Sequence, residues 1–333
     1  MLADPRAGTA AQALGIAERL GLPFRTVALE WGPFARLPIP WPSLAGLTRE
    51  ARAALWDAAR EPALSRFWAN LPEGVYPRAP SPVWPRLVLS AGRRSAPVAR
   101  WLRRRGAVAV QCMRPGLGAA DFDLLVIGRH DSPRPAPNVL EILGACHRLS
   151  PERLAAARAE WPDLAALPGP RVAVLVGGPV RGKGMPVGDA AQLIPRVAKR
   201  FPGATLLVTT SRRTGEAATA AIAQALRDLP HRLYRWGDPG PNPYAGFLAQ
   251  ADAIVVTGDS VSMLSEACAT GAPVLVATRE EGRHLRLVHS LREAGLAAPL
   301  TDAGRGAPHP PLDEAGRVAA EIRGRFAAAV GTS

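Results

Sequence analysis

The hydrophobic positions of the chain alternate between short apolar runs and longer stretches that carry an apolar residue every three or four positions. Short runs of aliphatic and β-branched residues are typical of buried strands, and the longer stretches are typical of amphipathic helices. Strands, loops and helices in regular succession predict an α/β fold with doubly wound parallel sheets. The predicted strands are residues 1–3, 26–29, 86–90, 107–110, 122–127, 171–176, 204–210, 253–256 and 274–276.

The alternation starts over near the middle of the chain. A helical stretch over residues 151–166 ends at Leu167-Pro168-Gly169-Pro170, where proline removes backbone N–H groups and glycine favours a turn. At 333 residues the chain is long enough for two domains that each bury a core. We predict two Rossmann-like domains, residues 1–167 and 168–310, and a helix within residues 311–333 that packs back on the N-terminal domain.

The stretch from Thr257 to Ala267 is a candidate anion site, because it combines a strand end, a Gly/Asp/Ser turn and a helix start. Asp259 or Ser260 can cap this helix, whose first N–H groups and positive dipole end attract a phosphate. Ser262 and Glu266 lie four positions apart, on one helical face. A phosphate at the helix start and a hydroxyl-rich group beside Glu266 would fit a nucleotide sugar. The alternative is an ordinary capped helix.

Two further loops follow predicted strands of the same half, and the carboxyl ends of parallel strands share one edge of a sheet. Gly177 and Gly178 would let the backbone approach a ligand closely, because they lack Cβ atoms. Arg212 or Arg213 could hold a phosphate in a bidentate contact. A structural turn and a solvated arginine pair are the respective alternatives.

Polar residues also follow the predicted strands of the first half. A histidine beside an aspartate can act as a general base, although a lone histidine is more often a hydrogen-bonded structural residue. No H-E-x-x-H, G-x-S-x-G or C-x-x-C motif is present, and no paired acidic motif of the kind that holds a divalent metal, so we expect no metal and a metal-independent mechanism. The residues in question are Asp4, Arg6, Arg93, Arg94, His130 and Asp131.

Composition indicates a globular, cytoplasmic protein. Hydrophobic residues make up 47% of the chain, and no segment reaches the roughly 18 consecutive apolar residues of a membrane span. Cys112, Cys146 and Cys268 are far apart in apolar surroundings, which predicts packing residues rather than a disulfide or metal site. The first predicted strand is short, and a beginning upstream of Met1 would account for this.

The formal charge of +13 raises the question of nucleic-acid binding. Lys183 and Lys199 are the only lysines, so the excess is arginine, as in chains with the proline- and alanine-rich bias of a GC-rich genome. The densest basic run, residues 86–105, lacks aromatic residues other than Trp101. We therefore consider nucleic acid an unlikely partner and expect phosphorylated substrates or an anionic membrane surface instead. A proline-rich loop over residues 31–42 either packs on its own domain or contacts lipid or an apolar acceptor.

Several motifs together resemble the mitochondrial-fission ELM-like family, whose bacterial members are described as glycosyltransferases. The resemblance runs from the first residues to about Leu287, and its last motif is the most specific. The motifs are Asp4-Pro5-Arg6-Ala7-Gly8, Ser90-Ala91-Gly92-Arg93-Arg94, Phe122-Asp123 leading to His130-Asp131, Asn138-Val139, Ser211-Arg212-Arg213-Thr214, Asn242-Pro243-Tyr244 and Val256 to Ala267.

That family is similar to GT-B glycosyltransferases, particularly the enzyme that adds N-acetylglucosamine to the lipid intermediate of peptidoglycan. The resemblance implies two Rossmann-like domains facing a cleft, with Glu266 on the nucleotide ribose and the glycine pair near the donor diphosphate. Pro179 departs from the pattern, since a hydroxyl residue usually follows the glycine pair. From the loops and the resemblance together, the predicted nucleotide-sugar residues are Gly177, Gly178, Ser211, Arg212, Arg213, Asp259, Ser260, Val261, Ser262, Met263 and Glu266.

We therefore expect a metal-independent glycosyltransferase that uses a nucleotide-diphosphate sugar, UDP-linked, and needs no other cofactor. Its acceptor would be a cell-envelope molecule, such as a lipid-linked or lipopolysaccharide precursor, met at the inner membrane. His130, Asp131 or Asp4 would take the acceptor proton, and the acceptor side would include Arg6, Gly8, Arg93 and Arg94. A noncatalytic adaptor with the same shell, which recruits protein or membrane partners, and a nucleotide-sugar epimerase are the alternatives.

Overall fold

The computed structural model describes residues 1–32, 46–57, 85–179, 184–277, 282–301 and 306–331. Most of the proline-rich loop over residues 31–42 lies outside these ranges. Within them, no helix has the length and apolar character needed to cross a membrane.

The second half of the chain forms a parallel sheet, as predicted, and this sheet has six strands, of which β9 and β12 were not predicted. Its strand order is β12-β11-β10-β7-β8-β9, so the chain winds outward from the centre in both directions. The central strands are buried on both faces, which explains their uninterrupted apolar sequences. The strands are β7 (Arg171–Val176), β8 (Thr205–Thr210), β9 (His231–Tyr234), β10 (Ala253–Val256), β11 (Val274–Val276) and β12 (Ala298–Pro299).

The first half contains a second parallel sheet and a short strand pair. The four-stranded sheet has the order β3-β4-β5-β6, and β1 pairs with β2 in parallel beside it. Two parallel sheets in an α/β chain confirm the predicted fold class. The strands are β1 (Leu2–Ala3), β2 (Val27–Ala28), β3 (Leu87–Ala91), β4 (Val108–Cys112), β5 (Leu124–Gly128) and β6 (Val139–Ile142).

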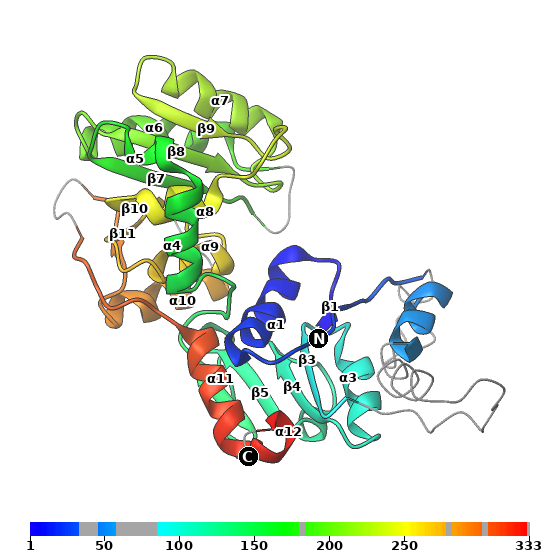
Figure 1. Ribbon diagram of the computed structural model, residues 1–333. Coiled ribbons are helices and arrows are strands. Elements are labelled where there is room, and N and C mark those ends of the chain that lie inside the picture. The colour runs from blue at the N-terminus through cyan, green and yellow to red at the C-terminus, as the bar shows by residue number, and fades with distance from the viewer. Residues whose placement is uncertain (33–45, 58–84, 180–183, 278–281, 302–305, 332–333) are drawn as a thin grey trace.

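Helices cover both faces of each sheet (Figure 1). One predicted helix, over residues 151–166, is two helices, because Pro162 has no N–H to continue the first. The helices are α1 (Ala7–Leu20), α3 (Ala96–Arg103), α4 (Pro151–Glu160), α5 (Pro162–Ala165), α6 (Val187–Arg200), α7 (Glu216–Leu226), α8 (Tyr244–Gln250), α9 (Val261–Cys268), α10 (Gly282–Glu293), α11 (Glu314–Arg325) and α12 (Ala327–Val330), with residues 49–57 also helical.

The hydrophobic cores show which helices belong to which sheet. Helix α11 returns from the second half and packs against α1, where Val318 and Ile322 share a core with Ile16 (Figure 1). Helix α4 instead contributes Leu154 and Ala157 to the core beneath α8 and β10. The chain therefore crosses between the two domains before α4 and again before α11.

Several hydrogen bonds hold the first crossing in place, and some of them join the two domains. The Oγ of Ser265 on α9 accepts from the main-chain N–H of Ala145 at 2.9 Å, in the linker before α4. The carboxylate of Glu314 accepts from the neighbouring N–H of Leu143 at 2.6 Å. Arg286 on α10 donates to a carbonyl of the N-terminal domain at 2.8 Å. Helix α9, which carries the candidate anion site, is thus bonded directly to the linker.

Candidate functional site

Ser260, rather than Asp259, caps α9. Its Oγ accepts from the main-chain N–H of Met263 at 3.4 Å, and its backbone is extended, as an N-cap requires. The carboxylate of Asp259 instead accepts from the hydroxyl of Thr257 at 2.8 Å. The first turn of α9 contains no acidic residue, so its dipole end stays available to an anion.

The loops that follow β7, β8 and β10 are joined by two buried threonines. The Oγ1 of Thr257 accepts from the N–H of Gly177 at 2.7 Å, and that of Thr214 donates to the carbonyl of the same glycine at 2.6 Å. Both threonines are fully buried. The three predicted loops therefore meet at one edge of the sheet. Neither threonine is among the site residues predicted from the sequence, although Thr214 follows Arg213 directly and Thr257 lies two positions before Asp259.

The packing of these loops explains the glycine pair without a ligand. A Cβ atom on Gly177 would overlap the carboxylate of Asp259, and one on Gly178 would overlap the main chain of Arg213. The N–H of Gly177 is also already used by Thr257. This geometry favours a structural turn, rather than a ligand contact, as the role of Gly177. The N–H groups that could bind an anion are then those at the start of α9.

The two arginines after β8 point to different places. Arg213 is half-buried, and its guanidinium donates to the carbonyl of Asp259 at 3.3 Å, which places a positive charge beside the start of α9. Arg212 is exposed and lines a groove of about 800 Å³ between α7 and the loop after β9. The side chain of Trp236, in that loop, is 61% exposed and borders the same groove. Ser211 holds the turn by accepting from the N–H of Arg213 at 3.2 Å.

Glu266 lies one turn further along α9, paired with Tyr244 at the start of α8. The tyrosine hydroxyl donates to Oε2 of the carboxylate at 2.6 Å. Burial raises the pKa of Glu266 to about 7, and the hydrogen bond from Tyr244 opposes that rise. Burial also raises the pKa of Tyr244 well above its usual value, so its hydroxyl stays protonated. No ion pair to Glu266 is present in the part of the chain that the structure describes.

The N-terminal domain meets this region at the first turn of α1. A Cβ on Gly8 would lie 3.2 Å from the Oγ of Ser262, so the first turn of α1 lies against the start of α9. The loop after β1 leads into this turn. Asp4, in that loop, is buried and accepts from the N–H of Arg6 at 2.9 Å. The structure therefore places one predicted acceptor-side residue, Gly8, beside Ser262 at the start of α9, and Arg6 lies two positions before that glycine. The Arg6 side chain is exposed.

The remaining N-terminal candidates lie on neighbouring loops of the same domain. Arg93 and Arg94 follow β3, and both are exposed. The glycine before them contacts the first turn of α1 through Thr9, so this loop and the loop of Arg6 are adjacent. These arginines give the domain a positive rim.

His130 lies in the short 3₁₀ helix after β5, and its side chain folds inward. The residue is only 3% exposed, and its Nε2 is 3.9 Å from the carboxylate of Asp131. Its main-chain carbonyl, not its ring, accepts the interdomain hydrogen bond from Arg286. A role for the imidazole as a base stays a prediction. Asp131 is more exposed than His130 and lies on the same loop.

Comparison with known proteins identifies relatives of the whole chain. A family profile described as "Mitochondrial fission ELM1" matches residues 7–326. The "Mitochondrial fission protein ELM1" of Arabidopsis thaliana is 32% identical over 276 residues, which cover 73% of this chain and 64% of that protein. The chain thus spans about two thirds of the length of this plant relative.

Solved structures share the architecture at low sequence identity. The UDP-GlcNAc 2-epimerase of Methanocaldococcus jannaschii has a TM-score of 0.53 at 11% identity, covering 96% of this chain and 98% of that one. Os79 from O. sativa, solved in complex with U2F and trichothecene, has a TM-score of 0.50 at 13% identity, covering 99% and 92%. These similarities show the fold, which is that of GT-B glycosyltransferases and related epimerases.

Proposed function

The chain belongs to the mitochondrial fission ELM1 family, and from its GT-B fold and the geometry around α9 we propose that it is a metal-independent glycosyltransferase. It would transfer a sugar from a nucleotide-diphosphate donor, UDP-linked, to an acceptor of the cell envelope. The Glu266–Tyr244 pair is the observation that carries this proposal. Among the described residues, the largely buried carboxylate of Glu266 has one hydroxyl partner and no ion pair. Burying such a carboxylate costs free energy, and the hydroxyl groups of a bound ligand would offset that cost.

Donor binding would use two parts of α9. The diphosphate would lie at the helix start, on the main-chain N–H groups of Val261 and Ser262. Arg213 would add a positive charge there and stabilise the diphosphate as negative charge develops on it during sugar transfer. One turn later, Oε1 of Glu266 would accept from the ribose hydroxyls while Oε2 remains bonded to Tyr244.

The acceptor would bind on the N-terminal domain, on the side that faces the start of α9. Gly8 lies against Ser262, so the preceding loop with Asp4 and Arg6 would face the donor phosphates. An acceptor that carries phosphate groups, such as a lipid-linked or lipopolysaccharide precursor, would suit the positive rim formed by Arg6 with Arg93 and Arg94. The same arginines would favour peripheral contact with an anionic membrane.

The proton of the acceptor hydroxyl needs a base on the same side. Asp4, Asp131 and His130 are the candidates, and each lies on a loop of the N-terminal domain. His130 would have to expose its buried ring before it could act. The carboxylate of Asp131 needs no such change, because it is already partly exposed.

A noncatalytic adaptor is the second candidate. The name of the Arabidopsis relative refers to mitochondrial fission, and the glycine loop after β7 is filled by the protein's own side chains. An adaptor would keep the fold for recruiting partners and would bind no nucleotide. A nucleotide-sugar epimerase would bind the same donor, but it would change a free nucleotide sugar without any acceptor.

Nucleotide binding separates these candidates at the first step. We expect a thermal-shift screen of uridine and guanosine diphosphate sugars to reveal one that raises the melting temperature by several degrees, since a ligand at 100 times its Kd adds about 2.7 kcal/mol. Glu266→Ala should lose the shift, whereas Glu160→Ala, an exposed carboxylate at the end of α4, should keep it. No shift with any nucleotide, together with identical behaviour of Glu266→Ala and wild type, would refute donor binding.

Product analysis then separates a transferase from an epimerase. The protein is incubated with the stabilising nucleotide sugar, with and without a lipid extract of the cell envelope. A transferase should release the nucleoside diphosphate and label the lipid fraction only when the extract is present. Conversion of the nucleotide sugar to an isomer in its absence would identify an epimerase.

A further inference from the structure

Helix α1 carries a buried glutamine, Gln12, where its apolar face begins. The residue is only 8% exposed. In the part of the chain that the structure describes, no residue forms a hydrogen bond with its side-chain amide. The apolar residues that follow on this face belong to the core of the N-terminal domain, and they are Ala13, Ile16, Ala17 and Leu20.

A buried amide normally has partners, because burying its N–H donors and its oxygen without hydrogen bonds costs free energy. Gln111, the other buried glutamine among the described residues, meets this rule at both ends. Its Nε2 donates to the carbonyls of Gly92 and Cys112, each at 2.9 Å. Its Oε1 accepts from the hydroxyl of Ser90 at 2.6 Å. Neither polar atom of the Gln12 amide is sealed inside the protein, so a ligand can reach both.

The neighbours of Gln12 on α1 show which part of the molecule it faces. Successive side chains of a helix are about 100° apart, so that of Gln12 leaves the helix between the positions of Gly8 and Thr9. Gly8 lies against Ser262, at the start of α9. Thr9 lies against Gly92, in the loop after β3. Gln12 therefore faces the place where α9 and the loop after β3 meet the first turn of α1.

The length of this side chain brings its amide toward the candidate site. Long side chains of a helix point back toward its N-terminus, over the residues three and four positions earlier. For Gln12 these residues are Thr9 and Gly8, and the glycine has no side chain to fill the space. The amide therefore extends over Gly8 toward Ser262.

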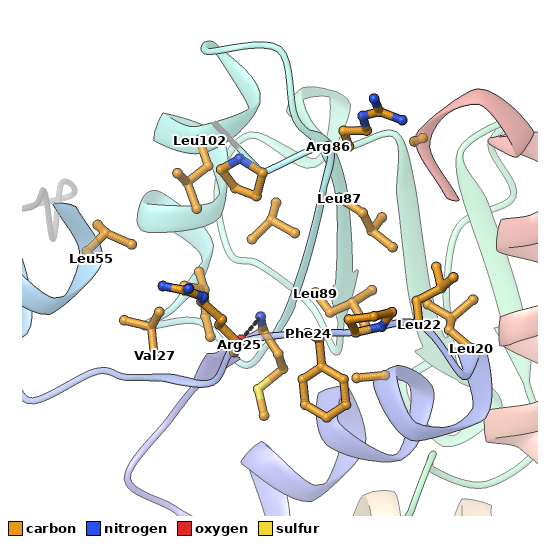
Figure 2. Close-up of a pocket in the computed structure, with 17 residues that line it drawn as sticks. Leu20, Leu22, Phe24, Arg25, Val27, Leu55, Arg86, Leu87, Leu89 and Leu102 are labelled. Carbon is orange, nitrogen blue, oxygen red and sulfur yellow. Dashed lines mark hydrogen bonds between the residues drawn. The ribbon is translucent and has the colours of Figure 1, made fainter. Parts of the chain in front are cut away.

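The opposite end of α1 has a different chemistry. Leu20, and Leu22 just beyond the helix, line a cavity of about 590 Å³ there (Figure 2). Arg25 and Arg86 are the charged residues of its lining, and the other lining side chains are apolar. No carboxylate, hydroxyl or amide side chain lines this cavity among the described residues, so Gln12 is the polar group that α1 offers to a ligand near Ser262.

We propose that Gln12 determines donor specificity, by a hydrogen bond between its amide and a hydroxyl group of the transferred sugar. This inference rests on the proposed function, in which the diphosphate lies at the start of α9 and Glu266 binds the ribose. The group on the other side of the diphosphate is then the sugar. A hydroxyl group both donates and accepts, as an amide does, whereas phosphate oxygens only accept.

Two substitutions test this contact. Gln12→Met keeps an unbranched side chain of similar length without the amide, and Gln12→Asn keeps the amide but makes it one methylene shorter. Gln192→Met, at an exposed position of α6, is the matched control. The Kd of UDP, UDP-glucose, UDP-galactose and UDP-N-acetylglucosamine is measured for each protein by isothermal titration calorimetry at pH 8, and the melting temperature shows that each variant is folded.

For the nucleotide sugar that wild type binds most tightly, we expect both Gln12 variants to raise the Kd at least about fivefold. The Kd of UDP should change by less than about twofold, because UDP lacks the sugar. Gln192→Met should leave both Kd values unchanged. The melting temperature of Gln12→Met should not fall, since an amide without a partner contributes no hydrogen bond to the fold.

The comparison of UDP with the nucleotide sugar separates the ways in which this inference can fail. An unchanged Kd for the nucleotide sugar in both Gln12 variants, with UDP still bound, would overturn it and leave the proposed function standing. An equal rise in Kd for UDP and for the nucleotide sugar would also overturn it, because the amide would then contact the nucleotide. If wild type binds neither UDP nor any of the nucleotide sugars, the proposed function fails and this inference fails with it.

Discussion

The protonation state of Glu266 should control nucleotide affinity. Ribose hydroxyls donate hydrogen bonds, so they need the carboxylate form, and burial holds the pKa of Glu266 at about 7. Binding must then release a proton, and affinity must rise with pH. For a group of pKa about 7, the carboxylate fraction is about 10% at pH 6 and 90% at pH 8. The Kd at pH 6 should therefore be roughly tenfold larger than the Kd at pH 8.

Tyr244→Phe should amplify this dependence. The lost hydrogen bond stabilises the carboxylate and holds the pKa of Glu266 down, and a bond to a charged group contributes about 1.5–3 kcal/mol. Its removal would raise the pKa by about one to two units and weaken binding about 5- to 50-fold at pH 7. At pH 9.5 the variant should recover to within about twofold of wild type, because the carboxylate then predominates in both.

Isothermal titration calorimetry with UDP at pH 6, 7, 8 and 9.5 measures these affinities directly. The phosphates of UDP titrate near pH 6 as well, so Glu266→Gln is the matched control, since it keeps that contribution and the shape of the side chain. The ratio of the wild-type Kd to the Glu266→Gln Kd should fall about tenfold from pH 6 to pH 8. Parallel pH profiles for the two proteins would refute a ribose contact by Glu266.

Three further predictions concern stability. His147 is buried, and desolvation lowers its pKa to about 4, so as pH falls below 6.5 the unfolded state takes up the proton before the folded state does. Between pH 7.5 and pH 5, the free energy of unfolding of wild type should therefore fall by about 2 kcal/mol more than that of His147→Gln, as measured by urea unfolding. Gly178→Ala should cost at least about 2 kcal/mol, because the new Cβ overlaps the main chain of Arg213, whereas Gly188→Ala in open space on α6 should not destabilise; equal urea midpoints would contradict this. Ser265→Ala should cost about 1–3 kcal/mol, because it leaves the buried N–H of the interdomain linker unpaired, and a loss below about 0.5 kcal/mol by the same assay would argue against that role.

Buried strands of the second domain could be predicted closely from the sequence, since both faces of β7 and β10 require apolar residues. Strand β9 (His231–Tyr234) was not predicted, because it is only partly buried and begins with two adjacent polar residues, His231 and Arg232. Helix α10 was missed because its charged residues outnumber the apolar positions, such as Leu287 and Leu291, that face the core. The sequence pattern therefore predicts an element most reliably when all of its residues are buried, as in β7 and β10.

For the candidate site, the sequence predicts which loops come together but not which side chains contact each other. Strand ends at one edge of a sheet must meet, which is why Gly177, Arg213 and Asp259 converge. The pairing of Glu266 with Tyr244 spans 22 positions and depends on how α8 packs beside α9, which no local rule gives. The inward fold of His130 has a local basis, because its ring lies where a Cβ on Gly128, two positions earlier, would be.

A crystal structure of the protein with UDP bound tests the central claim most directly. The account predicts the diphosphate on the main-chain N–H groups of Val261 and Ser262 and the ribose hydroxyls within hydrogen-bonding distance of Glu266. Electron density for the nucleotide at another place, or none at the start of α9 with UDP at saturating concentration, would contradict it.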